Sequence, residues 1–390
     1  MPSPVQDRPG LLIRDPFHYS DTTLIIPPVM AACLEFYDGS HTDLDMKEML
    51  VRLTGDLQAG ELERHLTGTL ARAGFLEDEN YAALREERHR TFAESSQRSP
   101  AHAGSAYPEE LQPLQQTLNR YMDCDPVPGA ASLAGIAAPH VSPEGGWQSY
   151  QAAYRSLNGH GAAHVFAILG TSHYGQPDRF GLTRKPFATP LGEARTETRL
   201  VNELADKAGA AVVMEDYCHS VEHSIEFQVL FLQHLYGPDV RILPILCGSF
   251  ARSIYEGGIP EDDDGVRAFF DVLGNIAARE SDRLCWILGV DMAHMGRRYG
   301  DSQPATAGTG EMLTVAERDR QRIDRMVEGD AAGFWELVQE NHDDLKWCGS
   351  APIYTFLKSH PSASGRLEHY QQWNIDEESV VTFAGITFQG

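Results

Sequence analysis

Two stretches, Leu133-Ala-Gly-Ile-Ala-Ala-Pro-His140 and Phe166-Ala-Ile-Leu-Gly-Thr-Ser-His173, decide the fold of this 390-residue chain. Each is a short apolar run that passes into a loop and then reaches a histidine. Such runs, bounded by Gly, Pro or Ser, are typical of buried strands. Polar residues just beyond strand ends gather at one edge of an α/β sheet, so the two histidines are candidates for a shared site.

The same alternation of strand, loop and helix continues through the rest of the chain from about residue 100. It predicts an α/β fold with a mixed, largely parallel central sheet flanked by helices. Residues 96–390 are a comfortable size for one such domain with a single large core. The expected strands are residues 133–138, 164–169, 241–247, 284–290 and 380–388.

Residues 1–95 have a different pattern, which predicts a separate small α+β domain. Helix-spaced apolar residues indicate three helices, near residues 29–37, 44–53 and 61–72. The segment 76–81 is expected to form a short wing hairpin, and the Arg- and Glu-rich segment 82–99 a helical linker. Three helices and a hairpin together favour a winged-helix fold.

The charge balance argues against two classes of partner. Asp and Glu number 56 and Lys and Arg number 32, for a net charge of -24, so nucleic-acid phosphates and anionic membrane surfaces would be repelled. No window approaches the roughly 20 apolar residues that cross a bilayer. The first nine residues lack the apolar centre of a secretory signal. Six scattered cysteines without a CxxC pair fit reduced thiols, so we expect a cytoplasmic protein.

A third potential ligand is Cys348, which lies between Trp347 and Gly349 ahead of an apolar helix. A thiolate at the start of a helix has a lowered pKa, which favours metal binding. The alternative is a buried, inert cysteine. With His140 and His173, Cys348 would form a ligand set that suits iron, copper or zinc.

Two further segments are rich in titratable groups. Glu222 stands beside His223 and could orient its imidazole and raise its basicity, although a polar helix start is an equal alternative. Asp291 and His294 follow a very apolar strand and could be an acid/base pair, or could cap the next helix. His102 lies in a tight Gly-Ser loop that could line a site.

Taken together, these segments resemble the Memo family, also called AmmeMemoRadiSam system protein B, over residues 100–390. This family is similar in fold to the class III extradiol dioxygenases, which bind non-haem Fe(II). The matching pieces are Ala101-His-Ala-Gly-Ser-Ala-Tyr107, Ala137-Ala-Pro-His140, Ile168-Leu-Gly-Thr-Ser-His173, Glu222-His-Ser-Ile-Glu226, Ile242-Leu-Pro-Ile-Leu246, the Asp291 and His294 pair, and Cys348-Gly.

The resemblance implies a function for most of these residues. His140, His173 and Cys348 would be the metal ligands, with Fe(II) the expected metal and copper or zinc as alternatives. His223 would be the base toward substrate, with Glu222 beside it. Asp291 and His294 would be further catalytic residues of the same pocket.

Three functions remain open at this stage. The first is a dioxygenase-like iron oxidoreductase that acts on a small molecule or a peptide. The second is a non-catalytic metal- or peptide-binding regulatory protein, and the third is a zinc hydrolase. The pattern Arg14-Asp-Pro and Asp38-Gly-Ser-His-Thr42 resembles PqqD-like winged helices, which hold leader peptides. It implies a peptide or protein partner for residues 1–95.

Overall fold

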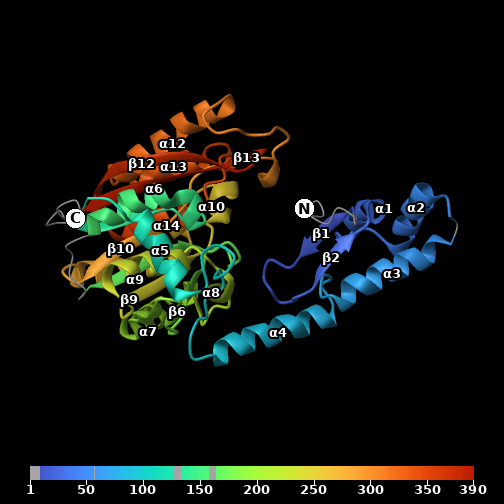
Figure 1. The fold of residues 1–390 in the computed structure, drawn as a ribbon, viewed down its shortest axis with the longest axis horizontal. Coiled ribbons are helices and arrows are strands. Elements are labelled where there is room, and N and C mark those ends of the chain that lie inside the picture. Colours follow the sequence, from blue (N-terminus) through green and yellow to red (C-terminus); the bar gives the residue numbers. More distant parts are fainter. Residues whose placement is uncertain (1–8, 57, 126–132, 158–163) are drawn as a thin grey trace. The chain divides into compact units, whose positions relative to one another are not determined.

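The computed structural model describes residues 9–56, 58–125, 133–157 and 164–390. The expectation that the chain starts without a secretory signal concerns the first eight residues, which lie outside the described ranges. The chain divides into two compact units, Met1–Glu94 and Ser95–Gly390 (Figure 1). This division falls one residue before the expected boundary. No helix in the described ranges combines the length and the apolar character that a bilayer crossing requires.

The N-terminal unit begins with a hairpin and continues with helices. Its core contains Cys33, Leu50 and Leu66, from three successive helical segments. The capping box of Thr42 and Asp45 starts one helix, and Gly55, in the left-handed conformation at φ 71°, ends it. The elements are β1 (Leu11–Arg14), β2 (Thr23–Ile26), α1 (Pro28–Ala31), η1 (Ala32–Phe36), α2 (Asp43–Thr54), α3 (Ala59–Arg72) and α4 (Glu79–Glu94).

The hairpin expected at residues 76–81 is wrong. Asp78 accepts a hydrogen bond from the backbone N–H of Tyr81 at 2.9 Å, which is the bond of a helix N-cap, and α4 begins at Glu79. The antiparallel hairpin of this unit is β1 with β2, ahead of the helices. The winged-helix assignment therefore stays a prediction.

The C-terminal unit is built on one mixed sheet, which confirms the predicted fold class. The strand order is β11-β13-β3-β10-β4-β9-β5-β8, and the four central strands from β3 to β9 are parallel. The strands are β3 (Leu133–Ala138), β4 (Val165–Thr171), β5 (Phe180–Leu182), β6 (Phe187–Thr189), β7 (Gly192–Thr196), β8 (Val212–Met214), β9 (Arg241–Cys247), β10 (Leu284–Gly289), β11 (His294–Gly296), β12 (Ser364–Asp376) and β13 (Ser379–Gln389).

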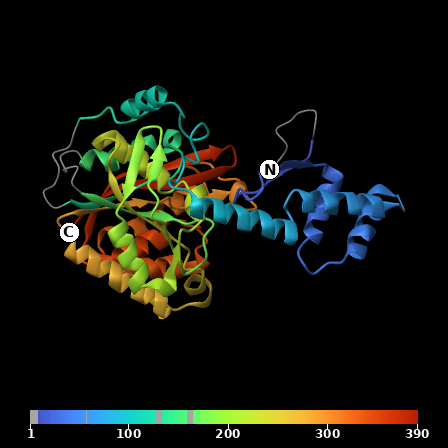
Figure 2. The ribbon, with the colours of Figure 1, turned by 90° about the horizontal axis from the view of Figure 1, so that it is seen from below.

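Helices cover both faces of this sheet (Figure 2). In β10, Trp286 and Leu288 pack into one core, while Cys285 and Ile287 pack into the core on the opposite face. This alternation follows from the two-residue period of a strand. The longer helices are α5 (Leu111–Tyr121), α6 (Pro143–Tyr154), α7 (Thr198–Lys207), α9 (Glu226–Tyr236), α11 (Asp264–Arg279), α12 (Glu311–Val327), α13 (Ala331–Gln339) and α14 (Ser350–Ser359).

Shorter helical turns link these elements. They are α8 (Cys218–Val221), α10 (Ala251–Glu256), η2 (Arg155–Leu157), η3 (Gly209–Ala211), η4 (Pro260–Asp262), η5 (Arg297–Tyr299) and η6 (Glu340–His342). The parallel strands β3, β4 and β10 end at one edge, so the residues after them approach one another there.

Candidate metal centre

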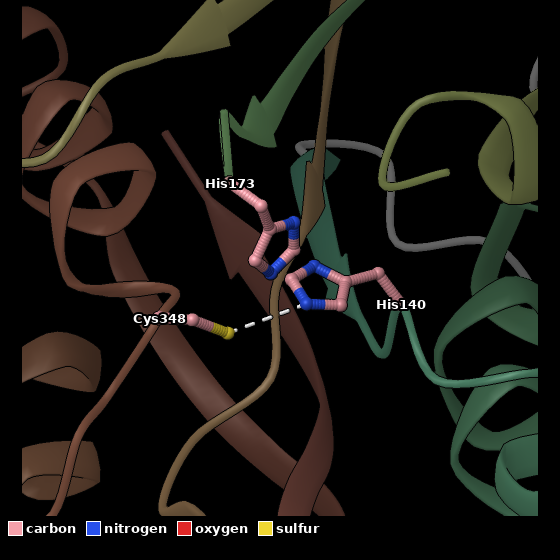
Figure 3. A group of neighbouring side chains, drawn as sticks. All are labelled: His140, His173 and Cys348. Carbon is pink, nitrogen blue, oxygen red and sulfur yellow. Dashed lines mark hydrogen bonds between the residues drawn. The ribbon is translucent and has the colours of Figure 1, made fainter. Parts of the chain in front are cut away.

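Three side chains from distant parts of the chain converge at this edge (Figure 3). His140 follows β3, His173 follows β4, and Cys348 lies two residues before α14. Their potential ligand atoms all lie within 4.8 Å of one another. The Cys348 Sγ is 3.3 Å from the His140 Nε2, close to the separation of about 3.5 Å that a tetrahedral zinc-like ion imposes on sulfur and nitrogen ligands.

The imidazole of His140 is held in one orientation. Its Nδ1 lies 2.9 Å from the carbonyl oxygen of Gly289 and therefore donates, which leaves Nε2 as the acceptor that faces Cys348. The backbone N–H of His140 donates to Asp291 Oδ1 at 2.9 Å. The side chain is 2% exposed. A buried, oriented imidazole with a free Nε2 is a ready metal ligand.

His173 is oriented in the same way by a carboxylate. Its Nδ1 lies 3.1 Å from each carboxylate oxygen of Glu222, and its backbone N–H donates to Oε2 at 2.9 Å. Burial alone would lower the pKa of His173, but Glu222 and Cys348 raise it well above its ordinary value. Because Nδ1 of His173 faces Glu222, Nε2 is the nitrogen left for a metal.

Cys348 reaches the centre because glycine follows it. A Cβ on Gly349 would lie 2.6 Å from the carbonyl oxygen of Asp291 and 2.7 Å from Cβ of Val290, so the two segments can approach only with glycine here. Burial raises the pKa of the Cys348 thiol, yet the imidazoles of His140 and His173 outweigh burial and lower it. The thiolate, which is the form that binds metals, is therefore favoured.

His223 completes a triangle of imidazoles. Its ring centroid lies 5.1 Å from that of His140 and 5.0 Å from that of His173, and His140 and His173 are also 5.0 Å apart. Burial and the neighbouring imidazoles lower the pKa of His223 well below its ordinary value, against the effect of Glu222. His102 packs edge-on against His223 at 5.5 Å, so the loop histidine does line the site.

Glu222 forms a second close group with His173 and His223. Its carboxylate also accepts the backbone N–H groups of His173, His223 and Ser224, at 2.9, 2.9 and 3.2 Å. These bonds occupy the oxygens that a second metal would need. Glu222 is therefore a residue that orients imidazoles, chiefly His173 and only secondarily His223.

Asp291 and His294 lie at the border of the site. Asp291 Oδ2 is 3.5 Å from the His140 Nε2, and burial raises the pKa of Asp291 to about 6. The Nδ1 of His294 lies 2.9 Å from the carbonyl oxygen of Met292 and 3.1 Å from that of Lys346. His294 thus holds the segment that carries Cys348.

Sequence reasoning missed two residues of this region. Arg98, which was expected in a helical linker, is fully buried and donates to the carbonyl oxygens of His219 and Glu222 at 2.8 Å each, while it pairs with Glu226. The ring of Tyr299 packs edge-on against His294 at 4.9 Å. Neither has a local sequence signal, because the partners of each are set by the tertiary fold.

Comparison with known proteins places these residues in a family. Residues 98–387 match the family described as Memo-like protein. A MEMO1 family protein of Thermococcus kodakarensis is 29% identical over 304 residues, which cover 75% of this chain and 99% of the relative. A MEMO1 family protein of Methanopyrus kandleri is 26% identical over 310 residues, with 75% and 99% covered.

A MEMO1 family protein of Aquifex aeolicus is 25% identical over 385 residues, which cover 97% of this chain and 95% of the relative. Because it covers 97% of this chain, its match includes most of the N-terminal unit. The family match itself covers nearly all of the C-terminal unit, with its His140, His173 and Cys348 cluster. The chain belongs to the Memo family.

Proposed function

We propose that the C-terminal unit binds a divalent iron ion and acts as a mononuclear non-haem iron oxidoreductase on a small-molecule or peptide substrate. The ligands are Nε2 of His140, Nε2 of His173 and Sγ of Cys348. The supporting observation is that both histidines commit Nδ1 to another group and turn Nε2 toward the same half-buried sulfur. Such a soft, mixed ligand set suits iron, copper and zinc more than magnesium or calcium.

A bound iron ion would supply redox chemistry and open positions for substrate and dioxygen. The protein's own contribution is proton handling by His223. Its Nδ1 lies 3.2 Å from Glu222 Oε1 and so carries the proton, which leaves Nε2 as the acceptor. Because its pKa is lowered, His223 is neutral near pH 7 and can take a proton from a substrate hydroxyl.

Asp291 and His294 support this chemistry from the border. Asp291 accepts the backbone N–H groups of His140 and Val141, at 2.9 and 3.3 Å, and so holds the first ligand in place. With its pKa raised to about 6, Asp291 can also exchange a proton near neutral pH. His294 holds the loop through its Nδ1, which lies 2.9 Å from the carbonyl oxygen of Met292 and 3.1 Å from that of Lys346.

The test is metal analysis of protein purified without oxygen, followed by Fe(II) loading and measurement of dioxygen uptake with candidate phenols. We expect iron at one equivalent and substrate-dependent uptake. Cys348→Ser should lose the metal. Zinc as the native metal would instead favour a hydrolase, and copper would change the redox assignment. Full iron occupancy without uptake on any substrate would count against the oxidoreductase.

A regulatory, non-catalytic role is the second candidate, and the separate N-terminal unit favours it. That unit lies outside the family match, which begins at residue 98, and could recruit a protein or peptide partner. His223→Ala distinguishes the two candidates, because it should spare metal uptake in both but abolish turnover only in an enzyme. A partner that binds residues 1–94 equally well in this variant would support recruitment.

A further inference from the structure

The segment that carries Cys348, residues 340–348, has an unusual backbone. Asn341, His342, Asp343 and Lys346 have positive φ angles of 53°, 55°, 53° and 55°. None of them is glycine, so each side chain is strained by a close approach to its own backbone. Four such residues so near one another persist only where surrounding contacts impose the conformation.

Trp347 is the main anchor of this segment. Its indole is 1% exposed, and its Nε1–H donates to Asp319 Oδ1 of α12 at 2.7 Å. Asp319 is fully buried, and its other oxygen accepts the hydroxyl of Tyr370 from β12 at 2.7 Å. A buried carboxylate with both oxygens in use is a stiff and directional acceptor. It fixes the residue directly before Cys348.

Arg322, also on α12, strengthens the same anchor. Its guanidinium lies over the Trp347 ring, 5.3 Å from the centroid, and donates to Asp343 Oδ1 at 2.7 Å. The other oxygen of Asp343 accepts the backbone N–H of Trp347 at 3.0 Å. The carboxylate of the strained residue Asp343 therefore links the guanidinium of Arg322 to the backbone of Trp347.

The opposite side of the segment is held by residues after β10. The backbone N–H of His294 donates to the carbonyl oxygen of Leu345 at 2.9 Å, and its ring Nδ1 to that of Lys346 at 3.1 Å. Thr171, at the end of β4, donates through its hydroxyl to the carbonyl oxygen of Cys348 at 3.1 Å. Hydrogen bonds thus fix the backbone of the segment on both sides. The side chain of Cys348 points toward His140.

We propose that Asp319 and Trp347 are positioning residues for the metal centre, which hold the strained segment so that Cys348 Sγ stands at ligand distance before any metal arrives. This inference rests on the proposed function only in taking Cys348 as a ligand. Neither residue touches the ligand atoms, and each acts through the backbone of residues 340–348.

Trp347→Phe tests the proposal, since it removes the indole N–H and keeps most of the ring. The probe is Co(II), titrated into metal-free full-length protein, because its thiolate charge-transfer absorption reports the sulfur–metal bond directly. We expect the Co(II) affinity to fall by about 10- to 100-fold and the charge-transfer band to weaken. The Cys348 thiol of the metal-free variant should also react faster with a thiol reagent, measured against Cys348→Ser as the background.

A control variant separates positioning from general destabilisation. Trp335→Phe removes an equally buried indole bond, to Ser253 Oγ at 2.8 Å, away from Cys348. This variant should keep the affinity and the band of the unchanged protein, whatever its urea denaturation midpoint. If Trp347→Phe does not fold, Asp343→Asn weakens the same network and takes its place with the same expectations.

The outcomes distinguish this inference from the metal centre itself. Unchanged affinity, band and thiol reactivity in Trp347→Phe, with Co(II) lost in Cys348→Ser, would overturn the positioning role and leave the metal centre standing. Equal losses in Trp347→Phe and Trp335→Phe would also overturn it. Co(II) binding with an intact affinity in Cys348→Ser would overturn the proposed centre first, and the positioning role with it.

Discussion

At the scale of single residues, Glu222 contributes more to the candidate centre than its position next to His223 suggests. Sequence reasoning paired it with His223, because adjacent residues are all that a local pattern can compare. In the folded chain its carboxylate accepts from both the ring and the backbone of His173, 49 positions earlier. The three candidate ligands could be proposed from the sequence, because two of them follow apolar strands, but the group that orients them could not.

Replacement of Glu222 by Gln should weaken metal binding. The amide would turn an NH2 group toward N–H donors that now meet a carboxylate oxygen, so His173 would lose its fixed orientation. We expect a decrease of about 10- to 100-fold in metal affinity, measured by competition with a chelator. Glu215→Gln is the control, since Glu215 also accepts a backbone N–H, from Arg184 at 3.1 Å. An affinity in Glu222→Gln equal to the control would refute the orienting role.

The buried imidazole of His219 should make the unfolding free energy depend on pH. Burial lowers its pKa to about 4, and its Nδ1 has no hydrogen-bond partner among the described residues. The folded state therefore binds a proton less readily than the unfolded state, whose pKa is near 6.5. The contribution of neutral His219 to the unfolding free energy is therefore fully present above pH 6.5 and decreases as the pH falls toward about 4.

The His219→Gln variant isolates this effect, because its amide can still donate to the carbonyl oxygen of Gly181, now 3.0 Å from the His219 Nε2. Between about pH 7.5 and about pH 5, the unchanged protein should lose about 2 kcal/mol more unfolding free energy than the variant. Urea denaturation at both pH values measures the difference. If the unfolding free energy of both proteins fell by the same amount, groups other than His219 would cause the acid sensitivity.

At the scale of elements, the longer buried strands were predictable, and the short or half-buried ones were not. β3 and β9 agree with the expected residues 133–138 and 241–247 to the residue, because each is a short apolar run between breakers. β12 was missed, since its residues are half-buried and it includes Arg366 and Glu368. Its place is fixed by pairing with β13, a contact that a local pattern does not reveal.

Arg98 joins several elements and should be costly to remove. Its guanidinium holds the α8 segment and pairs with Glu226 at the start of α9, where both side chains are fully buried. Arg98→Gln leaves the Glu226 carboxylate buried without its counter-charge. We expect a loss of about 3–5 kcal/mol in unfolding free energy by urea denaturation.

The matched control for Arg98 is Arg195→Gln. Arg195 pairs with Asp239 at 3.5 Å with both side chains largely exposed, and such pairs contribute about 0–1 kcal/mol in general. A small effect in both variants would mean that water or a shifted side chain replaces the buried Arg98 pair. A large loss in Arg98→Gln alone would establish that this pair holds α8 and α9 together.

At the scale of the whole molecule, the candidate ligands and the residues that orient them all belong to the C-terminal unit. The Thermococcus kodakarensis relative is covered over 99% of its length by a match that spans 75% of this chain. A chain of residues 95–390 should therefore fold and bind Co(II) with the affinity of the full-length protein. Metal titration and thermal denaturation of both proteins check this. Loss of binding on truncation would show that the N-terminal unit completes the centre.

The Cys348 sulfur and the His140 nitrogen that it meets are 208 positions apart along the chain. A nascent polypeptide that has left the ribosome as far as η6 already carries both imidazoles, but it still lacks the thiolate. Contacts over such separations form late in folding. Tight capture of the ion is therefore expected only after translation has passed the segment before α14, so that unfinished chains would not compete for the cell's metal supply.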